Sequence, residues 1–148
     1  MSKRINIWHT EPKATNALLA FESYLETTVL THTHKELIRM RASQINGCAY
    51  CMNMHSKDAL KSGEKAQRLF VLSAWRETDF FTEEEQAVLM LTEEITEISK
   101  GGVSDATYEK AAGLFDEVYL SQLIMAVIII NSWNRLAITI HSKPVMDK

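Results

Sequence analysis

The sequence has 148 residues, of which 46% are hydrophobic, with only five glycines and two prolines. This composition is typical of a single globular, helix-rich domain over residues 1–148, and it excludes a disordered chain. The formal net charge is -3, and the 16 lysines and arginines are spread among 19 acidic residues, so we expect no nucleic-acid partner.

Apolar residues recur at helical spacing along the chain, and strand-like alternation does not, which predicts an all-α helical bundle. The first expected helix begins at Pro12 and places on one side Ala14, Ala17, Leu18, Phe21, Leu25 and Val29. The next helices are expected over about 33–46, 48–62 and 64–75, the last of these with an apolar side made of Leu69, Phe70 and Leu72. A capping box at Thr82–Glu85 then opens a helix that carries Val88, Leu91, Ile95 and Ile98 and stops near Gly101. A short helix is expected from Ser104 to about Phe115, and a long one from about Tyr119 to His141.

The last helix is the most apolar part of the chain. Its β-branched run at 127–130 also fits a buried strand, but the apolar pattern continues to Ile140, and a lone strand would have no partner. A helix that is apolar on most sides must be buried centrally or in a subunit interface, so we expect a homo-oligomer. Four residues interrupt its apolar surface and are candidates for the site or a subunit contact: Asn131, Trp133, Asn134 and Arg135.

The N-terminus and the apolar runs predict the location of the protein. Residues 1–8 lack an apolar stretch of signal-peptide length, which predicts a cytoplasmic protein. The longest uninterrupted apolar run, Leu123 to Ile130, is far short of the roughly 20 residues that cross a bilayer, so we expect no membrane partner.

The only two cysteines of the chain, Cys48 and Cys51, follow an Asn46-Gly47 break at the start of a predicted helix. Unpaired amides at a helix N-terminus lower a cysteine pKa from about 8.5 to roughly 3.5–7.5. Residues i and i+3 share one helix face, so the pair can close a disulfide, and either sulfur can resolve a sulfenic acid on the other. The pattern predicts a two-electron redox switch that serves as both site and cofactor.

His55 lies one turn after Cys51 on the same face, where its imidazole can exchange a proton with the sulfur. Glu36 lies in the preceding helix, and its carboxylate orients the imidazole if the two helices fold back on each other. The alternative for Glu36 is a surface ion pair with Lys35 or Arg39 on its own helix.

These residues resemble the core of the alkylhydroperoxidase D and carboxymuconolactone decarboxylase superfamily. The resemblance rests on Glu36, eleven residues, Cys48-x-x-Cys51, three residues and His55. The segments 41–51 (Arg-Ala-Ser-Gln-Ile-Asn-Gly-Cys-Ala-Tyr-Cys) and 54–59 (Met-His-Ser-Lys-Asp-Ala) also match in composition and spacing, and the similarity is most convincing over about 33–75.

The resemblance implies an all-helical peroxidase of the antioxidant type that assembles as trimers or hexamers. It assigns peroxide attack to Cys51, resolution to Cys48, and a proton relay to Glu36 and His55. The expected partners are a hydroperoxide substrate and a dithiol or protein reductant. Alkylhydroperoxidase D has a histidine immediately before its second cysteine, where this chain has Tyr50; a phenol with a pKa of about 10 does not relay protons near neutrality. We expect Tyr50 to line the site or donate a hydrogen bond.

Two other functions remain open from the residues alone. A decarboxylase-like enzyme acting on a ring lactone would use His55 and Glu36 for proton transfer and leave the cysteines dispensable. A non-enzymatic helical oligomer would respond to redox state or to zinc through Cys48 and Cys51. Zinc sites usually draw two ligand pairs from separate loops, and no second Cys or His pair follows, so we expect no metal.

Overall fold

The computed structural model describes residues 4–147, and this part of the chain contains helices and no strand, which confirms the all-α prediction. The elements in chain order are α1 (Ile7–Thr10), α2 (Pro12–Tyr24), the 3₁₀ helix η1 (Leu25–Thr27), α3 (His32–Asn46), α4 (Ala49–Lys61), α5 (Ala66–Val71), η2 (Leu72–Glu77), α6 (Glu83–Thr96), η3 (Ile98–Lys100), α7 (Asp105–Leu114) and α8 (Glu117–Thr139).

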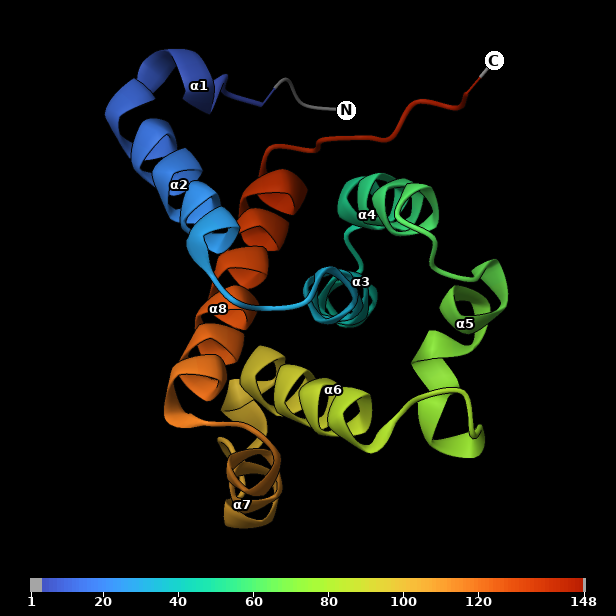
Figure 1. Ribbon diagram of the computed structural model, residues 1–148. Helices are drawn as coiled ribbons and strands as arrows, with labels where there is room; N and C mark the ends of the chain where they lie inside the picture. The colour runs from blue at the N-terminus through green and yellow to red at the C-terminus, as the bar shows by residue number, and fades with distance from the viewer. Residues whose placement is uncertain (1–3, 148) are drawn as a thin grey trace.

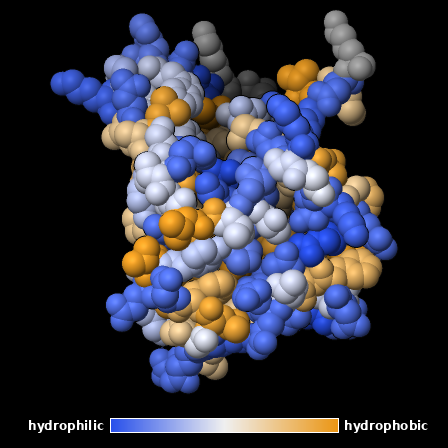
Figure 2. Space-filling model, viewed as in Figure 1, coloured by the Kyte–Doolittle hydropathy of each residue, from blue (hydrophilic) through white to orange (hydrophobic). Residues whose placement is uncertain are grey.

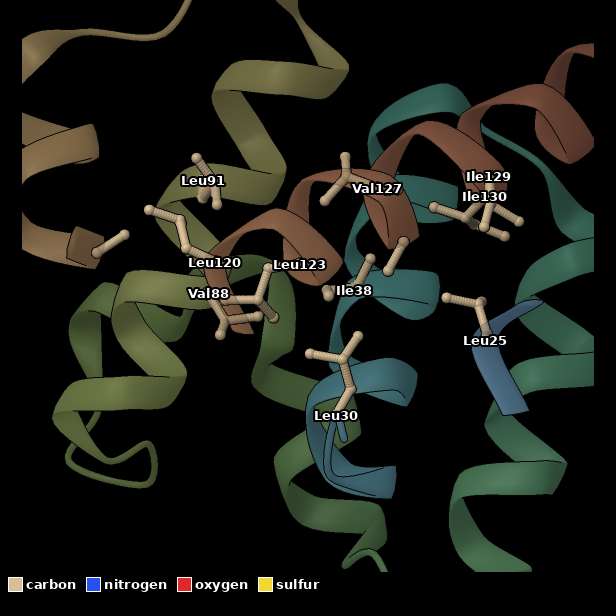
Figure 3. Packing of buried hydrophobic residues seen from close by; sticks show 13 residues of the cluster. Leu25, Leu30, Ile38, Val88, Leu91, Leu120, Leu123, Val127, Ile129 and Ile130 are labelled. Atoms are coloured by element: carbon tan, nitrogen blue, oxygen red, sulfur yellow. The ribbon is translucent and has the colours of Figure 1, made fainter. Parts of the chain in front are cut away.

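Helix α3 is the centre of the bundle. It packs against α4, α6 and α8, which surround it on three sides in Figure 1. Figure 3 shows the main core, where Ile38 of α3 lies close to Leu123 and Val127 of α8. A second apolar cluster joins α3 to the η2 and α6 segments through Leu37 and Trp75. Both helices that carry the predicted site, α3 and α4, are therefore fixed by the core on the sides that face away from solvent.

Side-chain caps explain where several helices begin. Thr82 and Glu85 form the predicted capping box, in which each side chain bonds the other residue's backbone N–H. Ser104 and Asp116 cap α7 and α8 by a single bond each, in which the side chain accepts the backbone N–H three residues later. Helix α3 ends at Gly47, whose φ of 69° is left-handed and favours glycine. These local signals account for the agreement between the predicted and observed helix starts.

The N-terminal part differs from the prediction. A separate short helix, α1, precedes α2, and the helix expected to continue to Val29 ends at Tyr24 and is followed by one 3₁₀ turn. Leu25 is buried there, whereas Val29 is 65% exposed in the loop before α3. The chain has to turn after Leu25 to reach the centre of the bundle, and the apolar spacing does not encode that turn.

The helix expected over 64–75 is divided. Helix α5 ends at Val71 and is followed by η2, whose backbone is kinked at Ala74. Leu69, Leu72 and Trp75 are buried. Phe70, predicted to be on the apolar side, is 82% exposed. The helix after Thr82 likewise ends at Thr96 and tightens into η3, which leaves Ile98 more than half exposed.

Helix α8 is, within residues 4–147, long and apolar enough to cross a membrane by length and composition alone. A central helix of a bundle has the same properties, and α8 packs against both α3 and α6. Its buried side includes Asn131 and Asn134, which hydrogen-bond to residues of other helices. We therefore interpret α8 as a core helix.

Figure 2 shows that the face viewed in Figure 1 is largely hydrophilic, with separate apolar patches.

Candidate active site

The turn between α3 and α4 carries both cysteines. Cys48 and Cys51 form a disulfide with their Cα atoms 5.3 Å apart, and both residues are buried. Cys48 is the N-cap of α4, and its sulfur accepts the backbone N–H of Cys51 at 3.3 Å. The positive helix terminus therefore acts most directly on Cys48, whereas the sequence had left open which of the two sulfurs it favours.

Glu36 and His55 meet between α3 and α4, as the sequence suggested they could. Nδ1 of His55 lies 3.4 Å from Oε2 of Glu36, and both side chains are buried. The separation is long for a hydrogen bond, and neither atom has another hydrogen-bond partner in the described part of the chain. The contact is a loose pair that directs Nδ1 toward the carboxylate, so Nε2 is the ring nitrogen available to a group at Cys51.

The other oxygen of Glu36 belongs to a wider charge network. Oε1 of Glu36 accepts from Arg39 at 2.6 Å, and the second arm of the guanidinium donates to Glu22 of α2 at 2.5 Å. Glu22 in turn accepts Nε1–H of Trp133 at 2.9 Å. One guanidinium thus joins the carboxylate beside His55 to a second carboxylate, and the network links α2, α3 and α8.

The charge on Glu36 is stabilised by this network. Burial by itself raises the pKa of the carboxyl, but the neighbouring His55 and the guanidinium of Arg39 outweigh it and bring the pKa below its ordinary value of 4.5. A carboxyl with a lowered pKa stabilises the folded chain above the unfolded-state pKa and loses that contribution as the pH falls through the folded-state value.

We expect Glu36→Gln to lower the free energy of unfolding at pH 7 by about 1–3 kcal/mol, since a charge-assisted hydrogen bond is replaced by a neutral one. The difference from wild type should be constant above about pH 6 and shrink as the pH falls below about 4.5. Urea unfolding at several pH values measures it. Glu26→Gln, which removes an exposed carboxylate, controls for net charge. A pH-independent difference would show that Glu36 is not held as a carboxylate.

A buried amide network holds the cysteine turn against α8. Nδ2 of Asn46 donates to Oδ1 of both Asn131 and Asn134 at 2.9 Å. Asn134, which is completely buried, donates to the hydroxyl of Ser43 at 3.0 Å. The carbonyl of Ser43 accepts the backbone N–H of Cys48 at 2.9 Å. Asn131 and Asn134, two of the four candidate residues in the last helix, therefore support the turn that carries the cysteines.

Asn134→Ala should cost about 1–3 kcal/mol in the free energy of unfolding, because it leaves the buried donors and acceptors of Ser43 and Asn46 with fewer partners. Chemical denaturation would measure this change. Ser121→Ala is the matched control, because it removes a polar atom from the exposed side of the same helix. Equal stability of the two variants would contradict a supporting role for the amide network.

A cavity of about 520 Å³ opens beside Cys51 and His55, between α1, α2, α4 and the end of α8. The surface in Figure 2 is hollowed between the sides formed by α2 and α4. Cys51 lines this cavity, whereas Cys48 does not. Most of the wall is apolar and is formed by Trp8, Leu19, Tyr50, Met54, Trp133 and Leu136.

The structure thus places Cys48, Cys51, Glu36 and His55 together, and it places Tyr50, 41% exposed, in the cavity wall. Lys35 points away from Glu36 and donates to the carbonyl of Leu25, so Arg39 is the cation of the pair. Over residues 4–147, no group of three or more His, Cys, Asp or Glu side chains is arranged to hold a metal ion.

Sequence reasoning missed Glu22, Trp8 and the role of Asn46. The i, i+3 spacing of Glu36 and Arg39 was a usable signal for their ion pair. Glu22 lies in a helix that shows no motif, and nothing in its sequence neighbourhood indicates contact with Arg39 or Trp133.

Comparisons with known proteins agree with this arrangement. The family model described as the carboxymuconolactone decarboxylase family matches residues 12–94, which include the cysteine turn, Glu36 and His55. The uncharacterized protein YdfG of Bacillus subtilis (strain 168) is 38% identical over 143 residues, which is 97% of each chain. The chain belongs to the carboxymuconolactone decarboxylase family.

Solved structures place this family member among alkylhydroperoxidase D-like proteins. A protein of unknown function from Agrobacterium tumefaciens, proposed to be the antioxidant defence protein AhpD, is 36% identical, with a TM-score of 0.93 over 98% of this chain and 100% of that one. The debrominase Bmp8 shares the fold at 18% identity, with a TM-score of 0.82 over 93% of this chain and 74% of that one. The family fold therefore occurs in proteins assigned to different chemistry, and the activity has to be argued from the site.

Proposed function

We propose that this protein is a cytoplasmic, thiol-dependent oxidoreductase that reduces hydroperoxides. The observation that carries the proposal is the position of Cys51, which belongs to a disulfide and also lines an apolar cavity next to His55. A sulfur that can alternate between thiol and disulfide, a base beside it and room for an organic substrate are the parts that such a reaction requires.

The proposed reaction proceeds in two steps. The thiolate of Cys51 attacks the terminal oxygen of the hydroperoxide, the O–O bond breaks, and the departing alkoxide takes a proton to become an alcohol. Cys51 is then a sulfenic acid. The thiol of Cys48 attacks that sulfur, the S–O bond breaks, and water leaves as the disulfide forms. Two electrons pass from the cysteine pair to the peroxide, and His55 moves the protons with Glu36 as its partner.

A dithiol is proposed to return the pair to its reduced form. Cys51 is the sulfur that faces the cavity, so we expect the reductant to attack there and Cys48 to leave. The backbone N–H that Cys48 accepts at the start of α4 stabilises it as a leaving thiolate, and a better leaving thiolate leaves faster.

One equivalent of tert-butyl hydroperoxide added to the reduced protein should give an intramolecular Cys48–Cys51 disulfide, because the two sulfurs are within bonding reach in the fold. Intact mass and peptide mapping measure this, and peroxide consumption with several dithiols then tests turnover and reductant together. Loss of no thiol, or recovery of intermolecular disulfides alone, would contradict the proposal.

Decarboxylation of a ring lactone is a second candidate, supported by the description of the matching family model and by the buried His55–Glu36 pair. In that reaction the carboxyl group of Glu36 and the imidazole of His55 would transfer protons, and the cysteines would be dispensable. A double Cys48→Ser, Cys51→Ser variant that retains full turnover of a lactone substrate would favour it over the redox reaction.

Homo-oligomerisation remains a prediction. An apolar groove of about 590 Å³ lies along α6, α7 and α8, where Ile128 of α8 is 40% exposed. Light scattering at micromolar concentration tests the expected trimer or hexamer.

Metal analysis of the purified protein, together with its mass in oxidised and reduced buffer, tests the non-enzymatic alternative in which zinc or the redox state controls assembly.

A further inference from the structure

Two indole rings form part of the wall of the Cys51 cavity. Trp8 of α1 and Trp133 of α8 stack with their ring centroids 6.2 Å apart and an angle of 20° between their planes. Tyr50 and Met54 of α4 also line the cavity. Aromatic rings attract other flat apolar rings through stacked and edge-to-face contacts, and a thioether adds sulfur–aromatic contacts. Saturated side chains do not offer these interactions.

The orientation of Trp133 is fixed by the charge network. Its Nε1–H, the only polar atom of the ring, donates to Glu22, and the second oxygen of Glu22 is held by Arg39. The indole therefore presents apolar surface to a ligand without leaving an unpaired donor. Because three helices contribute to this arrangement, the ring does not need to reorient when a ligand enters.

The size of the cavity also indicates an organic ligand. Its volume of about 520 Å³ lies in the range of small-molecule sites, which run from about 300 to 1,000 Å³. Hydrogen peroxide would occupy a small part of this space and contact little of its apolar wall. Trp8, Trp133 and Cys51 all line this one cavity.

We propose that this cavity binds a flat aromatic group, and that Trp133, held by Glu22, is the main determinant of this specificity. The inference rests on the proposed function in taking the ligand as a hydroperoxide whose reactive end lies at Cys51. Binding of the aromatic group itself does not require turnover, so it can be measured separately.

The test compares two unreactive alcohols with the same carbon skeleton, cumyl alcohol and 2-cyclohexylpropan-2-ol, on the full-length oxidised protein. Ligand-observed NMR titrations give the two Kd values. Cumyl alcohol should bind about two- to tenfold more tightly, which corresponds to aromatic contacts of about 0.4–1.4 kcal/mol. Equal affinities would overturn the proposal. Failure of both alcohols to bind would also overturn it; this result is expected if a segment of a second copy of the chain fills the cavity.

Trp133→Leu keeps an apolar side chain but removes the ring, so it should reduce the preference for cumyl alcohol. Phe70→Leu is the matched control, because Phe70 is exposed on α5 and does not line the cavity. If circular dichroism shows that Trp133→Leu does not fold, Trp8→Leu in the short first helix should reduce the preference. If the tested variant folds and keeps the full preference for cumyl alcohol, the assignment of the aromatic site to these indoles is overturned. This holds for Trp133→Leu, and for Trp8→Leu when it replaces Trp133→Leu.

The outcomes separate this inference from the proposed function. Preferential binding of the aromatic alcohol without consumption of any hydroperoxide would support the aromatic site and contradict the peroxidase proposal. Hydroperoxide consumption with no preference for the aromatic alcohol would contradict the aromatic site and leave the peroxidase proposal intact.

Discussion

Replacement of Cys51 by serine should reduce hydroperoxide consumption to the rate of a protein-free control. Cys51 is the cysteine that lines the cavity, so its sulfur is the one a substrate can reach. A serine hydroxyl at that position ionises far less readily than a thiol and forms no sulfenic acid. Steady-state consumption of tert-butyl hydroperoxide with a dithiol in excess measures the loss, and circular dichroism checks the fold.

Cys48→Ser is the matched control, because it removes the other sulfur from the same turn and leaves Cys51 at the cavity. With the dithiol left out, this variant should consume one equivalent of hydroperoxide and stop as a Cys51 sulfenic acid, which dimedone traps and mass spectrometry detects. If Cys48→Ser lost the first oxidation and Cys51→Ser retained it, the roles of the two sulfurs would be exchanged.

His55→Ala should slow the oxidation of the reduced protein by about 10²–10⁴-fold, the range that general acid–base catalysis contributes. The imidazole lies one turn after Cys51 on α4, and its Nδ1 faces Glu36, so Nε2 is free to exchange a proton with the thiol or the departing alkoxide. Glu36→Gln should slow the reaction less, since Glu36 orients the base and does not itself meet the substrate. Stopped-flow oxidation rates over a range of pH give both effects.

His32→Ala is a suitable control for the histidine substitution, because His32 is exposed at the first turn of α3. It should leave both the rate and its pH profile unchanged. A folded His55→Ala variant with the wild-type rate and pH profile would remove His55 from the mechanism and leave the start of α4 as the only activator of the thiols. Tyr50→His tests the tyrosine that stands where the resemblance to alkylhydroperoxidase D predicts a relay histidine; a higher rate would show that the lack of this relay group limits the reaction.

The disagreements between the predicted and observed helices have a common physical origin. Val29 and Phe70 fit an apolar helical pattern, yet both are exposed, because the chain turns after Leu25 and the helix that carries Phe70 ends at Val71, before the kinked segment η2. Amphipathic spacing reports which residues favour burial in a regular helix. It does not report where packing against another helix forces the backbone to leave that geometry.

Features that depend on residues a few positions apart can be predicted from the sequence. Helix geometry sets the i, i+3 cysteine pair, the base one turn later and the caps at Thr82 and Ser104. This geometry is the same wherever the helix lies. The charge pair of Glu36 and Arg39 belongs to the same class. These relations survive any arrangement of the helices in space, and for that reason they could be predicted before the fold was known.

The tertiary structure alone decided which sulfur faces the cavity and which residues complete its wall. Glu22 and Trp133 are 111 positions apart and Asn46 and Asn134 are 88 apart, yet each pair is joined by a hydrogen bond of 2.9 Å. Such contacts depend on how α2, α3 and α8 cross, which follows from the packing of the whole core and leaves no periodic trace in any one segment. The cavity lies between α1, α2, α4 and the end of α8, so only the packed arrangement of these helices determines it.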